Sequence, residues 1–196
     1  VDDNQARHHH YPRAPAAREM TRLVSSHDAE ALADLLALNR EFLAPWTPLW
    51  PDDFATVARQ RADIESVLQR HAQGTVLPHV VLDNGGEVVG RISLNDIVRG
   101  PFQSCRVNYW VSRHCNGRGL ATAALAHIKA IAFGELGLHR LQAETLVHNA
   151  ASQAVLARNG FERIGVAPAF FNIAGRWQDH IMFQLIDPDA EASEAG

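Results

Sequence analysis

The most informative segment of this chain is Val111-Ser112-Arg113-His114-Cys115-Asn116-Gly117-Arg118-Gly119-Leu120-Ala121-Thr122, where a predicted strand passes through a glycine-containing loop into a predicted long helix. Glycine lets a backbone approach a ligand closely and take torsions that are costly for other residues. The first N–H groups of a helix have no partner inside it, and together with the helix dipole they attract an anion. The segment therefore predicts a pyrophosphate-binding loop, in which Arg118 would add a positive charge.

Two other phosphate-binding loops are excluded by single positions. A dinucleotide-binding loop Gly-x-Gly-x-x-Gly needs glycine or alanine at its sixth position, where this chain has Thr122. The P-loop needs Gly-Lys-Ser or Gly-Lys-Thr, and the chain contains neither. A simpler interpretation stays open from the loop alone, because Gly117 and Gly119 could serve only to end a strand and start a helix.

Length and composition exclude several classes of protein. The 196 residues suit one domain, and 46% hydrophobic with 20% charged residues is ordinary for a globular protein with a sizeable core. A net charge of −4 provides no strong basic field, so we expect no nucleic-acid partner. The chain contains no run of about 18 apolar residues, so we expect no membrane span. Cys105 and Cys115 form no disulfide framework, which suggests a reducing cytoplasm.

The order of predicted elements indicates the fold class. We expect residues 1–19 to be a flexible N-terminal segment or a cloning remnant, residues 20–186 to form one domain and residues 187–196 to be a disordered tail. Strands are predicted at 21–24, 76–82, 87–97, 106–111, 141–146, 161–166 and 180–186, and helices at 26–38, 54–72, 119–136 and 150–159, with an ordered aromatic loop at 40–51. This order predicts an α/β (α+β) fold, in which helices lie on the faces of a mixed, partly antiparallel sheet.

Several motifs in the same order resemble the GNAT superfamily of acetyltransferases, on its RimJ/RimL branch. Asn116-Gly117-Arg118-Gly119-Leu120-Ala121 is similar to the loop Gln/Arg-x-x-Gly-x-Gly/Ala that binds the pyrophosphate of coenzyme A, although Asn116 replaces the first residue. Asn149-x-x-Ser152 with the later Gly160-Phe161 is similar to the second motif of that branch. Two further segments, residues 39–46 and Gly175-x-Trp177-x-Asp179, also resemble the branch.

The resemblance implies a fold and a cosubstrate. The GNAT fold is a mixed, mostly antiparallel sheet that is splayed at its fourth strand, with helices on both faces. The pantetheine arm of acetyl-coenzyme A would enter the splay and bind the backbone there. The residues expected to contact the coenzyme are Trp110, Val111, Ser112, Asn116, Gly117, Arg118, Gly119, Leu120, Ala121, Thr122, Asn149, Ser152 and Leu156. No metal is expected.

The chemistry needs a base for the amine and an acid for the departing thiolate, because an ammonium ion is not a nucleophile. The resemblance implies both candidates: Glu144, five residues before Asn149, is at the spacing of the base in the RimI branch, and Ser152 is the serine that lies near the thiol in the RimL pattern and is our candidate acid. For Glu144 the alternative is a half-exposed strand residue, and for Ser152 it is an exposed hydroxyl in the first turn of a helix. A tyrosine acid that a related branch carries is absent, because Leu156 occupies its position. His148 and His180 are weaker candidates.

The acceptor site is expected to include Glu41, Trp46, Asn95 and Trp177, with Glu41 holding a cationic amine. Core packing is the alternative role for the tryptophans. The expected function is transfer of acetyl from acetyl-coenzyme A to a primary amine, such as a protein or peptide N-terminus, by direct attack. Acetylation of a small amine or antibiotic, and a non-catalytic acyl-coenzyme A-binding module, stay open as alternatives. The branch often forms dimers, so a homodimer is expected.

Overall fold

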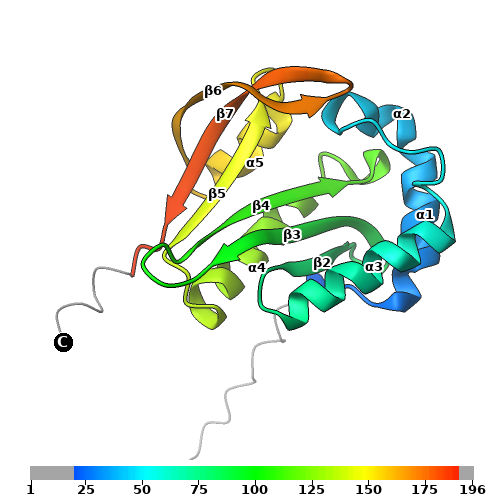
Figure 1. Cartoon of the computed structure of the whole chain (residues 1–196), viewed down its shortest axis with the longest axis horizontal. Helices are drawn as coiled ribbons and strands as arrows, with labels where there is room; N and C mark the ends of the chain where they lie inside the picture. The colour runs from blue at the N-terminus through cyan, green and yellow to red at the C-terminus, as the bar shows by residue number, and fades with distance from the viewer. Residues whose placement is uncertain (1–19, 190–196) are drawn as a thin grey trace, which may run out of the picture.

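A computed structural model of the chain describes residues 20–189 (Figure 1). Its seven strands form one sheet in the order β1-β2-β3-β4-β5-β7-β6. The strands are β1 (Thr21–Leu23), β2 (Leu77–Leu82), β3 (Val88–Val98), β4 (Ser104–Val111), β5 (Arg140–Leu146), β6 (Glu162–Ile173) and β7 (Arg176–Ile186). Only β4 and β5 are parallel neighbours, and every other pair is antiparallel. The expected mixed, mostly antiparallel sheet is confirmed.

Helices cover both faces of this sheet, as expected (Figure 1). One face packs against α4 (Leu120–Ala130) and α5 (Ala150–Arg158), and this layer holds the larger core cluster. The opposite face packs against α1 (Ala29–Leu38) and α3 (Val57–Ala72), which share a smaller cluster with β2. Side chains of a strand alternate between the two faces, so consecutive residues of β3, β4 and β5 serve different layers.

The sheet is splayed between β4 and β5. These strands pair over three residue pairs, Ser104 with Arg140, Cys105 with Leu141 and Arg106 with Gln142. Beyond Arg106 they diverge toward the end of the molecule that carries α2 (Arg40–Leu43) and the β6–β7 hairpin (Figure 1). β4 meanwhile stays paired with β3 as far as Val111. The predicted splay at the fourth strand is therefore confirmed, and it opens a gap in the middle of the sheet.

Two segments differ from the sequence-based expectation. Residues 40–51, expected as a loop, begin with α2 and a 3₁₀ turn, Ala44–Trp46, in which Pro45 is tolerated because the first turn of a helix needs no bonded N–H there. The last two strands are longer than expected and form a hairpin closed by Ala174 and Gly175, whose φ values are 51° and 78°. Pro168 and an irregular register between Ala167 and Phe171 interrupt the alternation that would have indicated one long strand.

The predicted N-terminal segment, residues 1–19, and residues 190–196 of the predicted tail, 187–196, lie outside the described residues. Within residues 20–189, no helix is both long and apolar enough to cross a membrane. The same part of the chain contains no group of three or more His, Cys, Asp or Glu side chains arranged to hold a metal ion.

Candidate active site

The predicted phosphate loop lies at the wide end of the splay, between β4 and α4. Gly117 and Gly119 have φ values of 75° and 76°, in the left-handed region that glycine enters without strain. The first N–H bonded inside α4 is that of Ala123, which donates to the carbonyl of Gly119 at 2.9 Å. The N–H groups of residues 120–122 come before it, and no side chain caps this helix end. The loop thus presents free donors to an anion, which fits the pyrophosphate of coenzyme A.

A buried asparagine holds the start of this loop in place. Asn39, at the junction of α1 and α2, donates from Nδ2 to the hydroxyl of Ser112 at 3.0 Å. Its Oδ1 accepts the main-chain N–H of Arg113 at 2.8 Å. Asn39 also donates to the carbonyl of Leu35 at 2.8 Å, so the loop is tied to the end of α1. The exposed residues 116–119 therefore follow a rigid anchor.

A cavity of about 570 Å³ opens beside the splay and extends along the face that α3 covers. It is lined by side chains from α3, α5, β3, β4, β5 and β7, together with residues around α2. Seven of the predicted site residues line it, namely Trp46, Asn95, Trp110, Glu144, Asn149, Ser152 and Leu156. The candidate base, the candidate acid and part of the expected coenzyme and acceptor sites therefore line one cavity.

The edge of β4 inside the gap has free backbone groups. The N–H of Ser112 donates to the carbonyl of Val89 on β3 at 2.8 Å, and in an antiparallel pair every second residue faces the same neighbour. Ser112 and Trp110 therefore direct their main-chain groups to β3. Those of Tyr109 and Val111 point to the gap, where β5 no longer pairs. Trp110, Val111 and Ser112 were expected to offer their backbone to the pantetheine arm, and only Val111 has this orientation. The motif does not show which alternate residues of the strand face which neighbour.

Ser152 lies against a tyrosine that the sequence analysis did not consider. The Tyr109 hydroxyl is 2.9 Å from Ser152 Oγ and 3.2 Å from the carbonyl oxygen of Ser152. Burial raises the pKa of Tyr109 to about 12, against a smaller opposing effect of the bond to Ser152. The Tyr109 hydroxyl therefore keeps its proton at neutral pH. Asn149 accepts the N–H of Ser152 at 3.1 Å and so caps α5, which leaves its amide N–H₂ free for a ligand.

Glu144 reaches the cavity from β5, on the face opposite the large core cluster. The carboxyl group is half-buried, and this desolvation raises its pKa, while the attraction of Arg106 opposes the rise and Asp96 adds to it. Arg106 is itself paired with Asp96. A carboxylate that holds a proton more tightly than usual is better matched to an amine, which is the property that a general base needs here.

His180 shares this face and is buried in the same cavity. Its Nδ1 lies 2.9 Å from the carbonyl oxygen of Gln178, a contact that requires the proton on Nδ1 and leaves Nε2 as an acceptor in the neutral ring. The adjacent Asp179 points to the opposite side, where it accepts the N–H of Ala169 at 2.9 Å. His180 is thus a second group in the cavity that can take a proton.

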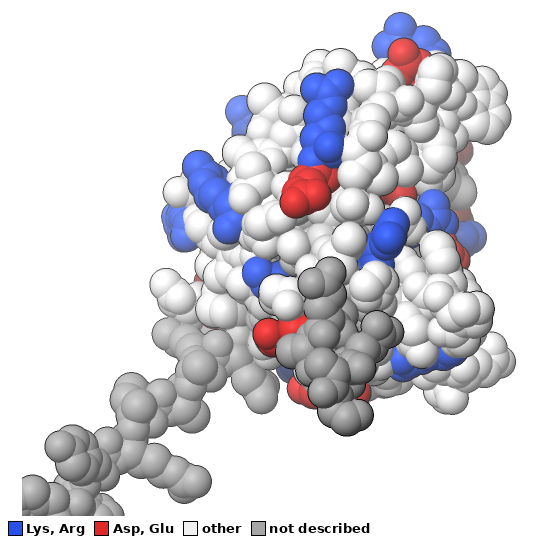
Figure 2. Space-filling view, turned by 90° about the vertical axis from the view of Figure 1, so that its left-hand side faces the viewer, with Lys and Arg blue, Asp and Glu red and all other residues white. Residues whose placement is uncertain are grey.

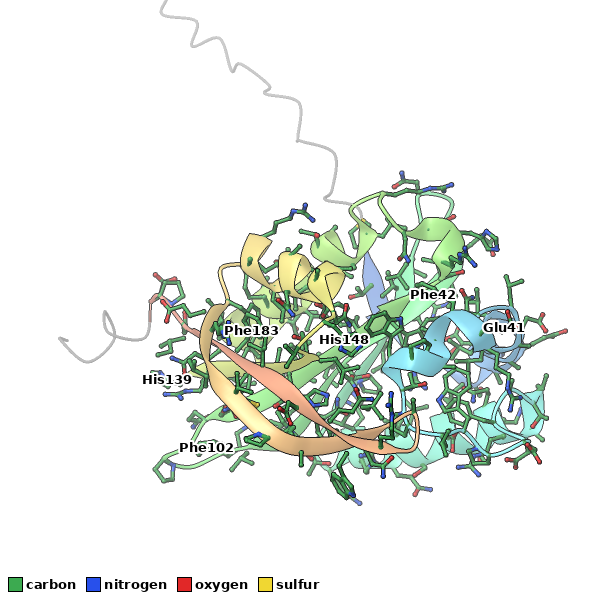
Figure 3. All side chains as sticks on the ribbon, turned by 90° about the horizontal axis from the view of Figure 1, so that it is seen from above. Glu41, Phe42, Phe102, His139, His148 and Phe183 are labelled. Atoms are coloured by element: carbon green, nitrogen blue, oxygen red, sulfur yellow. The ribbon has the colours of Figure 1, made fainter. Side chains whose placement is uncertain are left out.

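Two expected acceptor residues lie elsewhere. The side chain of Trp177 is 67% exposed on the β6–β7 hairpin and does not line the cavity. Glu41 is exposed and borders a separate hollow with Arg113 and His114, well apart from His148 in Figure 3. Trp46 does reach the cavity, with its ring centroid 5.4 Å from that of His148. The motif around Trp46 was informative, whereas exposure on a hairpin cannot be read from a Gly-x-Trp-x-Asp pattern.

Charge is spread rather than gathered on the face that Figure 2 shows, where lysine and arginine side chains stand apart with acidic ones between them. In the cavity itself the arginines are closer together, because Arg70 and Arg91 both line it. The sequence analysis did not find Arg91, since an arginine in the alternating pattern of β3 has no motif that would distinguish it from a solvent-facing residue.

Comparison with known proteins agrees with this geometry. The model of the acetyltransferase (GNAT) domain matches residues 18–162. A ribosomal protein uS5-alanine N-acetyltransferase of Escherichia coli is 33% identical over 173 residues, which cover 88% of this chain and 89% of the relative. The structure of a ribosomal-protein-S5-alanine acetyltransferase from Vibrio fischeri covers 86% of this chain and 93% of its own, with a TM-score of 0.82 and 31% identity.

A third relative was solved with a ligand. The structure of Mycobacterium smegmatis RimJ in complex with a coenzyme A disulfide has a TM-score of 0.83 and 29% identity, and it covers 87% of this chain and 82% of its own. The family model spans most of the residues that build the splay, the phosphate loop and the cavity. The chain therefore belongs to the GNAT family of acetyltransferases.

Proposed function

We propose that this enzyme transfers an acetyl group from acetyl-coenzyme A to the α-amino group of a protein or peptide N-terminus. One observation carries the proposal: Glu144 and the Ser152–Tyr109 pair line the same cavity, beside the open edge of β4. The E. coli relative is named for an alanine of ribosomal protein uS5, which supports a protein amine as the acceptor.

Residues of this chain would bind the coenzyme and transfer the protons that the reaction requires. The loop around Gly117 and Gly119 would hold the pyrophosphate, and the gap-facing backbone of β4 would hold the pantetheine arm. Acetyl-coenzyme A supplies the acetyl thioester. Glu144 takes a proton from the incoming ammonium, directly or through water, so that the amine becomes a nucleophile. Ser152 Oγ holds a proton for the departing sulfur, and the Tyr109 hydroxyl behind it can replace that proton.

Thiol release with acetyl-coenzyme A tests the proposal. The acceptors would be peptides with different first residues, polyamines and aminoglycosides, and mass spectrometry would locate the acetyl group. We expect acetylated peptide α-amines. Turnover of small amines alone would mean that the acceptor is a small amine and not a peptide. Tight coenzyme binding without transfer to any of these amines would favour the non-catalytic acyl-coenzyme A-binding module. Ser152→Ala should slow thiol release. Ser26→Ala is the control for the loss of a hydroxyl, because Ser26 is exposed and lies outside the cavity.

We also propose that the enzyme acts in the cytoplasm as a homodimer without a nucleic-acid partner. The free thiols of Cys105 and Cys115 support a reducing compartment. Light scattering of the purified protein measures the mass directly, and a monomer would contradict the dimer.

A further inference from the structure

The end of the cavity farthest from β5 is lined by two arginines. One stripe of α3, formed by Asp63, Ser66, Val67 and Arg70, faces the cavity at a spacing of three and four residues. Arg91 lies on β3 on the same side of the sheet. Ser66 and Arg70 are exposed, so this end of the cavity is open to solvent. A ligand bound near Glu144 could therefore extend past α3 and out of the molecule.

Neither arginine has a partner among residues 20–189. The structure gives the guanidinium groups of Arg70 and Arg91 no hydrogen bond and no ion pair to any residue in this range. The nearest carboxylates are occupied, because Asp63 is paired with Arg59 at 3.1 Å and Asp28 with Arg22 at 2.7 Å. A half-buried charge such as that of Arg91 is normally paired, so without an ion pair this guanidinium remains available to a ligand in the cavity.

The electrostatic environment agrees with that description. Burial lowers the pKa of Arg91, the nearby charge of Arg70 lowers it further, and Asp63 and Asp28 oppose the change. Arginine stays charged in proteins despite such shifts. Two like charges near one another repel, and a bound anion would relieve this repulsion.

The phosphates of the coenzyme are not that anion. Arg91 pairs with Trp110 across the β3–β4 ladder, while the neighbouring pair, Ile92 and Tyr109, faces the core layer that holds α4. The phosphate loop begins α4 on that other layer. The two arginines therefore lie across the sheet from the phosphate-binding end of α4, on the side where the acceptor must enter.

We propose that Arg70 and Arg91 bind an acidic side chain of the acceptor peptide, at its third or fourth residue; this inference rests on the proposed function. β3 and β5 are two strand spacings apart, roughly 10 Å, before the splay widens them further. An extended peptide advances about 3.3 Å per residue, so an amine at Glu144 and an acid two or three residues later would span this distance. A free amino acid, whose amine and carboxylate share one carbon, is too short.

Matched peptides test the subsite. Each pair begins with alanine and differs only by glutamate or glutamine, placed in turn at the second, third and fourth positions. The wild-type enzyme should prefer the glutamate member by about tenfold in kcat/KM at the best position, the effect of one hydrogen-bonded charge pair. Arg70→Gln, an exposed change that leaves the fold intact, should remove most of this preference, as should Arg91→Gln, while Arg91→Lys should keep part of it. Arg61→Gln is the matched control, because Arg61 is an exposed arginine of α3 outside the cavity.

The outcomes separate this inference from the proposed function. Equal turnover of the two members of every pair, a preference unchanged in Arg70→Gln and Arg91→Gln, or free alanine turned over as well as the peptides would overturn the subsite. Calorimetry of the peptides with the coenzyme A-bound enzyme provides a readout without chemistry. A third outcome is that no peptide is acetylated, yet the glutamate member of a pair binds more tightly and Arg70→Gln abolishes that difference. The proposed acetylation of peptides would then be wrong, whereas the anion subsite would be confirmed.

Discussion

Glu144 affects both the catalysis and the stability of the enzyme. Its half-buried position raises its pKa mainly through desolvation. The folded enzyme therefore binds this proton more tightly than the unfolded chain does, and stability is lost as the pH rises through the folded-state pKa. The same rise in pH produces the carboxylate that catalysis requires. At Glu144 the pH dependence of activity and that of stability therefore have opposite signs.

Glu144→Gln should lower kcat by about 10²- to 10⁴-fold, the usual contribution of a general base. The limb of the kcat/KM profile that rises with pH through the ionisation of Glu144 should disappear as well. Initial rates of thiol release between pH 5 and 9 would measure both effects. Glu162→Gln serves as the control, because Glu162 is exposed on β6. An unchanged rate in Glu144→Gln would instead direct attention to His180 as the base.

Gly90 allows two backbones to approach closely where the cavity meets the splay. A Cβ at this position would lie 2.2 Å from the carbonyl oxygen of Trp110 and 2.9 Å from the Cα of Val111. Neither atom can move without disturbing the β3–β4 ladder. Gly90→Ala should therefore lower the free energy of unfolding by about 2 kcal/mol or more, as overpacked sites do.

Urea unfolding would measure the loss in Gly90→Ala. Gly134→Ala is the comparison, since a Cβ there meets nothing within 4 Å and the residue lies in a helical turn, Ile131–Glu135. It should be neutral or stabilising by a few tenths of a kcal/mol. Equal losses in the two variants would show that the close approach at Gly90 is not what makes it necessary.

At the scale of elements, a chain of polar side chains joins β1, β2 and α4. The hydroxyl of Thr21 lies 2.9 Å from Nδ1 of His79 and 2.8 Å from Nδ1 of His127. Burial, with smaller contributions from the charges of His127 and His71, lowers the pKa of His79 to about 4. The folded state therefore binds this proton less tightly than the unfolded chain, whose histidine has a pKa near 6.5.

Acidification should destabilise the protein through His79. Stability should fall as the pH drops from about 6.5 toward 4, by up to roughly 1.4 kcal/mol per pH unit. In His79→Gln this part of the pH dependence should be absent, whereas His139→Gln should retain it, because His139 is exposed near the periphery of the molecule (Figure 3). Denaturant unfolding at pH 7, 6 and 5 would measure the free energy of unfolding of each variant. The same change with pH in His79→Gln and in the wild type would contradict the role of His79.

Most elements could be predicted from periodicity and turn signals, and the phosphate loop from its glycines. The β6–β7 hairpin could not be delimited, because Pro168 and a register shift hide its alternation. The site was predicted where a residue lies within a local motif, as Ser152 does. Tyr109 and Arg91 escaped prediction because their role depends on which face of the sheet they occupy, a property that pairing between distant strands decides.

At the scale of the whole molecule, the splay divides the sheet into β1–β4 and β5–β7, which share only three residue pairs. The amide groups of Tyr109 and Val111 face the gap without a strand partner. A pantetheine arm that binds there would protect them from solvent. Acetyl-coenzyme A at about 100 times its dissociation constant should also add about 2.7 kcal/mol to the free energy of unfolding.

Hydrogen exchange can locate that contact. Exchange at the amides of Tyr109 and Val111 should slow when the coenzyme is added, beyond what the global gain in stability produces. The amides of Asn108 and Trp110, already paired with β3, should follow the global change alone. Slowing at every β4 amide by the same factor would mean that the arm does not bind this edge.

The alternation of Asp179 and His180 has a consequence for how such an enzyme can diversify. The side-chain period of a strand is two, so insertion of one residue between the turn at Ala174–Gly175 and Asp179 would exchange the two faces of the strand. A carboxylate would then take the place of the imidazole inside the cavity, and every other inward group on that part of the hairpin would change at once. Insertions and deletions here therefore rewrite the acceptor chemistry in a single step, while substitutions adjust it one group at a time.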